Sequence, residues 1–216
     1  MNKSCPYGTH RVIAPIGALP QSADIIDNTM VCEKNEILIA VKTLNIDSAS
    51  FTQIKSACDG NEPKMIEMIE SIVSKRGKMQ NPVTGSGGML LGVVKEIGSD
   101  LNIDLKVGDS IATLVSLSLT PLKIYQVKQI HLDKDQIDIV GEAILFQTGI
   151  YAKIPYDLPA DLVLSALDVA GAPAQVAKLV KPGNRVLIIG AGGKSGVLCS
   201  YQARKSVGKD GFVYGL

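Results

Sequence analysis

RVLIIGAGGKSG, residues 185–196, is the stretch that decides the fold of this chain. An aliphatic run, Arg185–Ile189, leads directly into a glycine-rich turn, and a helical pattern follows over Val197–Val207. After a turn at Gly208–Gly211, Phe212–Tyr214 has the composition of a second strand. The order strand, glycine turn, helix and strand predicts a βαβ unit.

The glycine turn has the form of a dinucleotide-binding turn. Gly190 permits a tight exit from the strand, Gly192 lets the backbone approach a pyrophosphate, and the following helix offers free N–H groups and a favourable dipole. The third glycine of the GxGxxG fingerprint falls on Ser195, with Gly196 beside it, and a small serine can take that place. We therefore predict a dinucleotide site, with a plain strand-to-helix turn as the alternative. The predicted cofactor-binding residues are Gly190, Gly192, Gly193, Lys194, Ser195 and Gly196.

The spacing of residues also bears on two further features, a possible P-loop and the acidic residue that binds the ribose. Lys194 and Ser195 resemble the end of a P-loop, GxxxxGK[ST], but the first glycine of that motif would fall on Ile188. The acidic residue that grips the ribose hydroxyls normally ends the second strand, and here that strand reaches Leu216, so the choice between NAD and NADP cannot be predicted. Because two strands cannot make a doubly wound sheet, we expect residues 156–216 to be only the start of a nucleotide-binding domain.

The chain before residue 155 has a different composition. From Arg11 to about Ile154, short β-branched segments alternate with turns, which predicts a β-barrel or sandwich. An amphipathic helix is expected over Glu62–Lys75, with Gly77 ending it, and residues 161–179 form a helical pattern that Gly171 must bend or divide. The expected strands are Glu36–Val41, Leu90–Ile97, Asp109–Leu114, Ile124–Ile130 and Glu142–Phe146.

Composition excludes several classes of partner. The 216 residues carry a formal net charge of +1 with no basic cluster, so the basic face that nucleic acid needs is missing. The N-terminus lacks a secretory signal, and the apolar runs are too short to span a membrane. The cysteines are far apart, without CxxC spacing, and are expected to be reduced. We therefore expect a cytoplasmic protein with no nucleic-acid or membrane partner.

Several stretches carry a resemblance to a known superfamily. LGVVKEIG (91–98) followed by LKVGDSIA (105–112) resembles the "GxVxxxG…VGDxV" segment of the medium-chain dehydrogenases/reductases, and VKPG (180–183) resembles their lead into the nucleotide turn. The resemblance implies a mixed α and β fold, with a GroES-like β-barrel catalytic domain over residues 1–155 and the beginning of a Rossmann-type domain over residues 156–216. It also implies a nicotinamide cofactor, NAD or NADP, and a homodimer when the chain is full length.

The zinc-dependent members of that superfamily allow a test of metal content. Their three catalytic zinc ligands match Asp47, the Gly87-Gly88-Met89 segment and the neighbourhood of Ser165. A set of Asp, Gly and Ser cannot hold a zinc ion, and the four-cysteine lobe for a structural zinc is also missing. The resemblance therefore implies an enzyme that works without zinc.

A narrower resemblance is to a family of amino-acid dehydrogenases of bacterial lysine fermentation. It implies a small diamino acid as substrate, whose 3-amine is oxidised to a 3-oxo group with release of ammonia. The strings that carry it are CPYGTHRV (5–12), TLNIDSASFTQI (43–54), GKMQNPVTGSGGML (77–90), ATLVSLSLTPL (112–122) and LDVAGAPAQVAKLVKPG (167–183).

Without zinc, the reaction needs a side chain that accepts a proton from the amine. Asp47 is our predicted catalytic residue because it occupies a place where related enzymes put a metal ligand. The equally weighted alternative is an aspartate that caps a helix beginning near Ser50. Asn81, Thr84 and Ser86 are the predicted substrate-binding residues, since a glycine-rich segment with hydroxyls can receive a carboxylate; a flexible turn is the alternative.

Two other functions remain compatible with these residues. A zinc-free quinone or enone reductase of the same superfamily would also lack the metal ligands. A non-catalytic GroES-like module would keep the fold alone. The three hypotheses differ in what they predict for the cofactor: reduction by the diamino acid, oxidation by quinones, or no binding.

Overall fold

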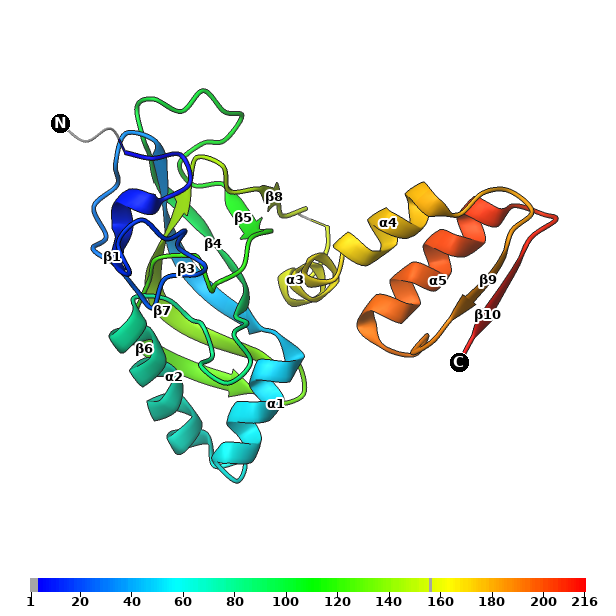
Figure 1. Cartoon of the computed structure of the whole chain (residues 1–216), viewed down its shortest axis with the longest axis horizontal. Helices are drawn as coiled ribbons and strands as arrows, with labels where there is room; N and C mark the ends of the chain where they lie inside the picture. The colour runs from blue at the N-terminus through cyan, green and yellow to red at the C-terminus, as the bar shows by residue number, and fades with distance from the viewer. Residues whose placement is uncertain (1–3, 156) are drawn as a thin grey trace. The chain divides into compact units, whose positions relative to one another are not determined.

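The computed structural model describes residues 4–155 and 157–216. The chain forms two compact units, Met1–Tyr156 and Asp157–Leu216 (Figure 1). The second unit contains the glycine turn that follows Ile189, and the first contains the β-rich segments.

A six-stranded antiparallel sheet forms the centre of the first unit, in the order β6-β7-β3-β4-β5-β8. All five expected strands are confirmed, and β3 and β7 are longer than predicted. In residues 4–155, β6 and β8 are the edge strands, so hydrogen bonding does not close the sheet into a barrel. A short 3-10 helix η1 (Thr9–Arg11) and a two-stranded ribbon of β1 (Val12–Ala14) and β2 (Ile25–Ile26) precede the sheet. The strands of the sheet are β3 (Glu36–Ile46), β4 (Gly88–Ile97), β5 (Ser110–Thr113), β6 (Leu122–His131), β7 (Gln136–Phe146) and β8 (Tyr151–Lys153).

Two helices, α1 (Ser48–Ala57) and α2 (Glu62–Arg76), pack against this sheet. The predicted helix is confirmed within one residue: Asn61 caps α2 through a bond to the Lys64 N–H, and Gly77 ends it in a left-handed conformation. The expected apolar stripe faces the core, where Met65 and Ile69 are fully buried beside Phe51 of α1. Core packing therefore holds α1 and α2 against the sheet.

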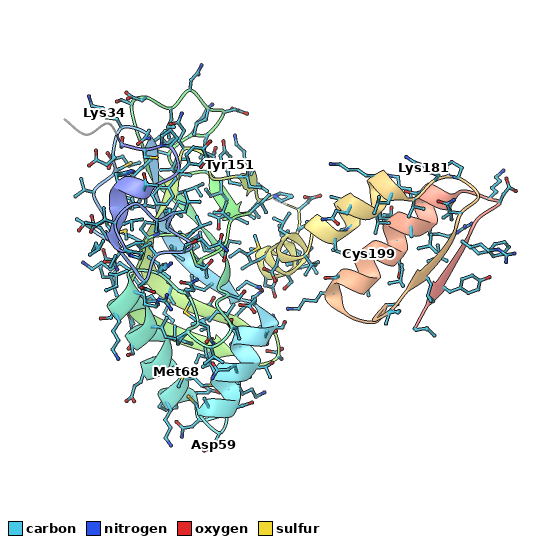
Figure 2. All side chains as sticks on the ribbon, in the orientation of Figure 1. Lys34, Asp59, Met68, Tyr151, Lys181 and Cys199 are labelled. Carbon is cyan, nitrogen blue, oxygen red and sulfur yellow. The ribbon has the colours of Figure 1, made fainter. Side chains whose placement is uncertain are left out.

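The second unit confirms the predicted βαβ order. The helical pattern at 161–179 divides into α3 (Ala160–Asp168) and α4 (Gly171–Leu179), and β9 (Arg185–Ile188) pairs in parallel with β10 (Phe212–Gly215). The helix α5 (Lys194–Val207) connects these two strands in the sequence. It packs against them through a buried face that includes Cys199 (Figure 2). No single described helix is long and apolar enough to cross a membrane; α3 and α4, bent by 54°, meet that test only as a pair, by length and composition.

Candidate functional site

The segment that joins α2 to β4, residues 77–87, which we call the site loop, is organised around Asn81. Asn81 is fully buried, and its Oδ1 accepts hydrogen bonds from the N–H groups of Val83 (2.8 Å) and Thr84 (3.4 Å). Its Nδ2 donates to Gln53 Oε1 on α1 at 2.8 Å. Because both ends of the Asn81 amide are bonded within the protein, the geometry makes Asn81 the residue that shapes the site loop.

Asp47 lies where β3 gives way to α1. Its Oδ1 accepts a hydrogen bond from the Ser50 N–H at 3.0 Å, so Asp47 caps the helix, as the alternative interpretation expected. Its Oδ2 is buried and has no hydrogen-bond partner among the described residues. One oxygen of this carboxylate therefore caps the helix, and the other is buried without a partner among the described residues.

The site loop brings its hydroxyl groups to the beginning of α1. The hydroxyls of Ser50 and Thr84 are 2.6 Å apart, and the Ser86 N–H donates to Thr84 Oγ1 at 3.4 Å. The Asp47 N–H donates to the Gly87 carbonyl at 3.4 Å. Asp47, Thr84 and Ser86 thus come from separate parts of the sequence to one place, where a carboxylate can accept a proton from an amine and hydroxyls can hold an anion.

Asn45 belongs to the same end of β3, and the sequence analysis missed it. Its side chain is fully buried, and its Oδ1 accepts a hydrogen bond from Gln136 Nε2 of β7 at 3.1 Å. Its Nδ2 has no hydrogen-bond partner in the described part of the chain. The available signal was an amide between two apolar residues, Leu44 and Ile46, whose side chains lie in the core.

In the structure, the residue of α5 that closely contacts the glycine turn is not the predicted Ser195. A Cβ at position 196 would collide with the carbonyl oxygen of Gly190 and with the backbone of Ala191. The interpretation that Ser195 takes the place of the third glycine is therefore wrong: Gly196 takes it, and Ser195 is exposed. The spacing is GxGxxxG, which allows α5 to pack directly against the turn.

The same turn fits a diphosphate on two grounds. At Gly192 an added Cβ would meet no atom within 4 Å, so the backbone there is open to an approaching group. The helix α5 begins at Lys194, three residues earlier than predicted, and its N-cap is Gly193, which has no side chain to cap it. The N–H groups in the first turn of a helix lack intrahelical partners and attract anions. The Gly190 N–H donates to the Leu216 carbonyl at 2.8 Å, which holds the turn at the end of β10.

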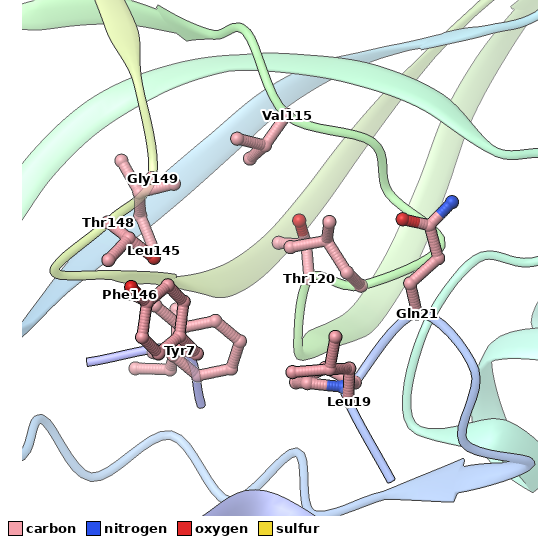
Figure 3. A pocket seen from close by; sticks show the side chains of 12 residues that line it. Tyr7, Leu19, Gln21, Val115, Thr120, Leu145, Phe146, Thr148 and Gly149 are labelled. Carbon is pink, nitrogen blue, oxygen red and sulfur yellow. The ribbon is translucent and has the colours of Figure 1, made fainter. Parts of the chain in front are cut away.

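A buried lysine and a cavity adjoin the start of the site loop. Lys78 is fully buried, and its Nζ donates to the carbonyls of Pro20 (2.6 Å) and Gln21 (3.2 Å). Burial lowers the pKa of Lys78 to about 8, and the charge of Arg76 acts in the same direction. Pro20 and Gln21 also line a cavity of about 240 Å³ (Figure 3). The rest of its lining is mostly apolar: Tyr7, Leu19, Val115, Leu119, Thr120, Ile144, Leu145, Phe146, Thr148 and Gly149.

The histidines are held in structural pairs. His10 Nε2 lies 2.9 Å from Glu36 Oε1, and His131 Nε2 lies 2.8 Å from Asp138 Oδ2. Across residues 4–155 and 157–216, no three His, Cys, Asp or Glu side chains gather as metal ligands.

Comparison with known proteins identifies close relatives. Residues 10–155 match the family described as the N-terminal domain of L-erythro-3,5-diaminohexanoate dehydrogenase. The curated L-erythro-3,5-diaminohexanoate dehydrogenase of Acetoanaerobium sticklandii is 61% identical over 216 residues, which cover 99% of this chain and 63% of that protein. The protein of the same name from Fusobacterium nucleatum is 60% identical over 218 residues, again covering 63% of its length. The chain therefore spans less than two thirds of these relatives.

Solved structures share the fold at low sequence identity. The CurK enoyl reductase matches with a TM-score of 0.51 and 15% identity, over 88% of this chain and 48% of that one. The CurF ER cyclopropanase from the curacin A biosynthetic pathway matches with a TM-score of 0.50 and 17% identity, over the same shares. The expectation of a mixed α and β fold is confirmed.

Proposed function

The chain belongs to the L-erythro-3,5-diaminohexanoate dehydrogenase family, and from that premise we propose that the whole protein oxidises the 3-amine of this diamino acid. The substrate and water yield 5-amino-3-oxohexanoate and ammonia, while a hydride passes to a nicotinamide cofactor, NAD or NADP. The observation that carries the proposal is the 61% identity to a relative of that name over 99% of this chain.

Two domains would divide this work. We assign residues 1–155 to a GroES-like catalytic domain and residues 156–216 to the beginning of a Rossmann-type nucleotide-binding domain. The family match over residues 10–155, the two compact units and the βαβ order of the second unit support this division. A homodimer of the complete protein and a cytoplasmic location are part of the same proposal.

The cofactor diphosphate would lie on the glycine turn. Gly192 leaves the backbone open, and the first turn of α5, which includes Lys194 and Ser195, presents N–H groups toward an anion. Gly190, Gly193 and Gly196 give the turn its shape. When bound, the nicotinamide supplies the hydride acceptor.

The substrate would bind beside Asp47. The ammonium at C3 must lose a proton before its carbon can release hydride, and water must then add to the resulting imine. We infer that Asp47 would accept that proton through Oδ2, which has no partner among the described residues, while Oδ1 stays bonded to the Ser50 N–H and fixes the orientation of the side chain. Thr84 and Ser86 would receive the substrate carboxylate, and Asn81 would hold the site loop in shape.

We propose that this chemistry proceeds without zinc. The positions that match zinc ligands in related enzymes hold Asp47, the Gly87–Met89 segment and Ser165 in this chain. Such a set offers neither a thiolate nor an imidazole, and His10 and His131 are already paired with Glu36 and Asp138.

The test is a cofactor assay with the whole protein. L-erythro-3,5-diaminohexanoate should reduce NAD or NADP, with one ammonia released for each reduced cofactor. Absence of reduction with either cofactor would overturn the proposal. Oxidation of reduced cofactor by quinones or enones, without response to the diamino acid, would identify a reductase instead, and failure to bind either cofactor would identify a non-catalytic module.

A further inference from the structure

A polar cavity of about 450 Å³ lies between α2 and β6, the edge strand that contacts this helix (Figure 1). The helix contributes Glu70, Val73 and Ser74, whose spacing along the helix places them on one face. The strand contributes residues 123–125. Within the described part of the chain, neither the site loop nor Asp47 contributes to this lining, so the cavity is separate from the candidate site.

The cavity carries two side chains of opposite charge that do not neutralise each other. Glu70 and Lys123 both line it, and neither makes an ion pair or a side-chain hydrogen bond with a described residue. Lys123 lies opposite Glu142 in the strand ladder. That carboxylate is already bonded to Lys95 and to the Tyr125 hydroxyl. The Lys123 ammonium lies over the Tyr125 ring, 5.6 Å from its centre. Both charges are therefore open to a ligand.

The open edge of β6 adds backbone groups to the same lining. The Leu122 N–H donates to the Gly77 carbonyl at 2.9 Å, and the Leu122 carbonyl accepts from Asn28 Nδ2 at 2.7 Å. Both backbone groups of Leu122 therefore point away from β7. Because this direction alternates along a strand, the N–H and C=O of Ile124 point to the same open edge. The ladder is regular from Leu122 to Ile124. The Ile124 N–H is thus a second donor beside Lys123.

We propose that this cavity binds a small zwitterionic amino acid, with its ammonium group on Glu70 and its carboxylate on Lys123. The Ile124 N–H and the Ser74 hydroxyl donate to the same carboxylate, and the buried Val73 contacts the carbon chain between the two charges. A ligand with a single charge leaves one charge of the cavity without a partner, and an apolar ligand leaves both. This binding site goes beyond the proposed function and does not depend on it.

The test is a calorimetric titration of the whole protein with three probes. They are 4-aminobutyrate, which carries both charges, butyrate, which carries only the negative one, and butylamine, which carries only the positive one. The zwitterion should bind saturably and at least about 10-fold more tightly than either of the others. Glu70→Gln and Lys123→Met should each weaken its binding at least about 10-fold, because each removes one charge-assisted contact. Both residues are exposed, so the variants should fold as the wild type does.

Matched controls come from the same helix and strand. Glu67→Gln on α2 and Lys128→Met on β6 change exposed charges that do not line the cavity, and they should leave binding unchanged. Ser74→Met fills the cavity without altering its charge and should abolish binding. Asp47→Asn should have no effect on binding.

Three results overturn the inference. The first is absence of saturable binding of 4-aminobutyrate to the wild type. The second is equal affinity in the wild type, Glu70→Gln and Lys123→Met. The third is loss of binding in Asp47→Asn, which would place the probe in the candidate site. None of these results bears on whether the protein oxidises the diamino acid, so a failure here is distinct from a failure of the proposed function.

Discussion

The Arg11 guanidinium binds both oxygens of the Glu36 carboxylate: Nε donates to Oε1 and Nη2 to Oε2, each at 2.6 Å. Glu36 is fully buried at the start of β3, and Arg11 is 4% exposed. Arg11 also donates to the carbonyls of Thr29 and Val31. This ion pair therefore ties the segment before β3 to the central sheet.

Replacing Arg11 with methionine should destabilise the protein by about 3–5 kcal/mol, because it leaves the Glu36 carboxylate buried with too few partners. Urea denaturation at neutral pH measures the loss. The double variant Arg11→Met/Glu36→Gln should recover part of it, since the charge is then absent. A loss in Arg11→Met within the range of an exposed ion pair, about 1 kcal/mol or less, would show that the pair does not hold this segment.

The ion pair of Arg11 and Glu36 also makes the stability of the protein depend on pH in the acidic range. Burial raises the pKa of Glu36, but the hydrogen bonds and charge of Arg11 outweigh it and hold the pKa below its ordinary value of 4.5. The unfolded chain then binds more protons than the folded protein, so the stabilisation is complete above 4.5 and is lost as the pH falls through the lower folded pKa. Urea titrations from pH 6 downward should show a steeper loss for the wild type than for Glu36→Gln; parallel curves would contradict this.

The glycine turn offers two substitutions with different expected effects. Gly196→Ala should destabilise the second unit by about 1–3 kcal/mol, because its Cβ collides with the Gly190 carbonyl. Gly192→Ala should leave thermal unfolding unchanged, since its Cβ meets nothing, yet weaken cofactor binding roughly 10-fold by blocking the approach of the diphosphate. Calorimetry of unfolding and of cofactor titration separates the two. Equal cofactor affinity in Gly192→Ala would remove the turn from the binding site.

Local patterns predicted most of the elements. The stripe that includes Met65 and Ile69 and the glycine at position 77 were enough to place α2, because period and capping are properties of neighbouring residues. The position of the third glycine was predicted wrongly because the fingerprint specifies a fixed spacing in the sequence. The close contact between helix and turn depends instead on the residue at which the helix begins. Since α5 begins at Lys194, Gly196 is the residue that meets the turn.

Long-range partners could not be predicted in the same way. Arg11 and Glu36 are 25 residues apart, and no local sequence pattern in either segment indicates that they pair. Asp47 shows the limit most clearly. Its capping bond to Ser50 follows from a local rule, but the burial of its second oxygen depends on tertiary packing, which the local sequence does not reveal.

Lys78 should make stability rise at alkaline pH. Its pKa is lowered to about 8 from 10.5, chiefly by burial, so the unfolded chain binds more protons between these values, and the free energy of unfolding increases with pH across that window. Relative to Lys78→Met, the wild type should gain roughly 2–3 kcal/mol between about pH 7 and pH 10.5. Lys75→Met, an exposed lysine on α2, is the control and should not alter the slope. A wild-type curve parallel to that of Lys78→Met would mean that Lys78 titrates as a solvent-exposed lysine does.

The two roles assigned to Asp47, helix cap and proton acceptor, can be tested with different substitutions. Asn is as good an N-cap as Asp, so Asp47→Asn should keep thermal stability while lowering kcat about 100-fold or more through loss of the proton acceptor. Asp47→Ala should lose about 1 kcal/mol of stability as well, because the bond to the Ser50 N–H disappears. Asn61→Ala, which removes the equivalent cap of α2, should cost similar stability without loss of kcat. Steady-state kinetics and thermal unfolding of the three variants measure both effects, and full turnover by Asp47→Asn would leave Asp47 with the helix cap alone.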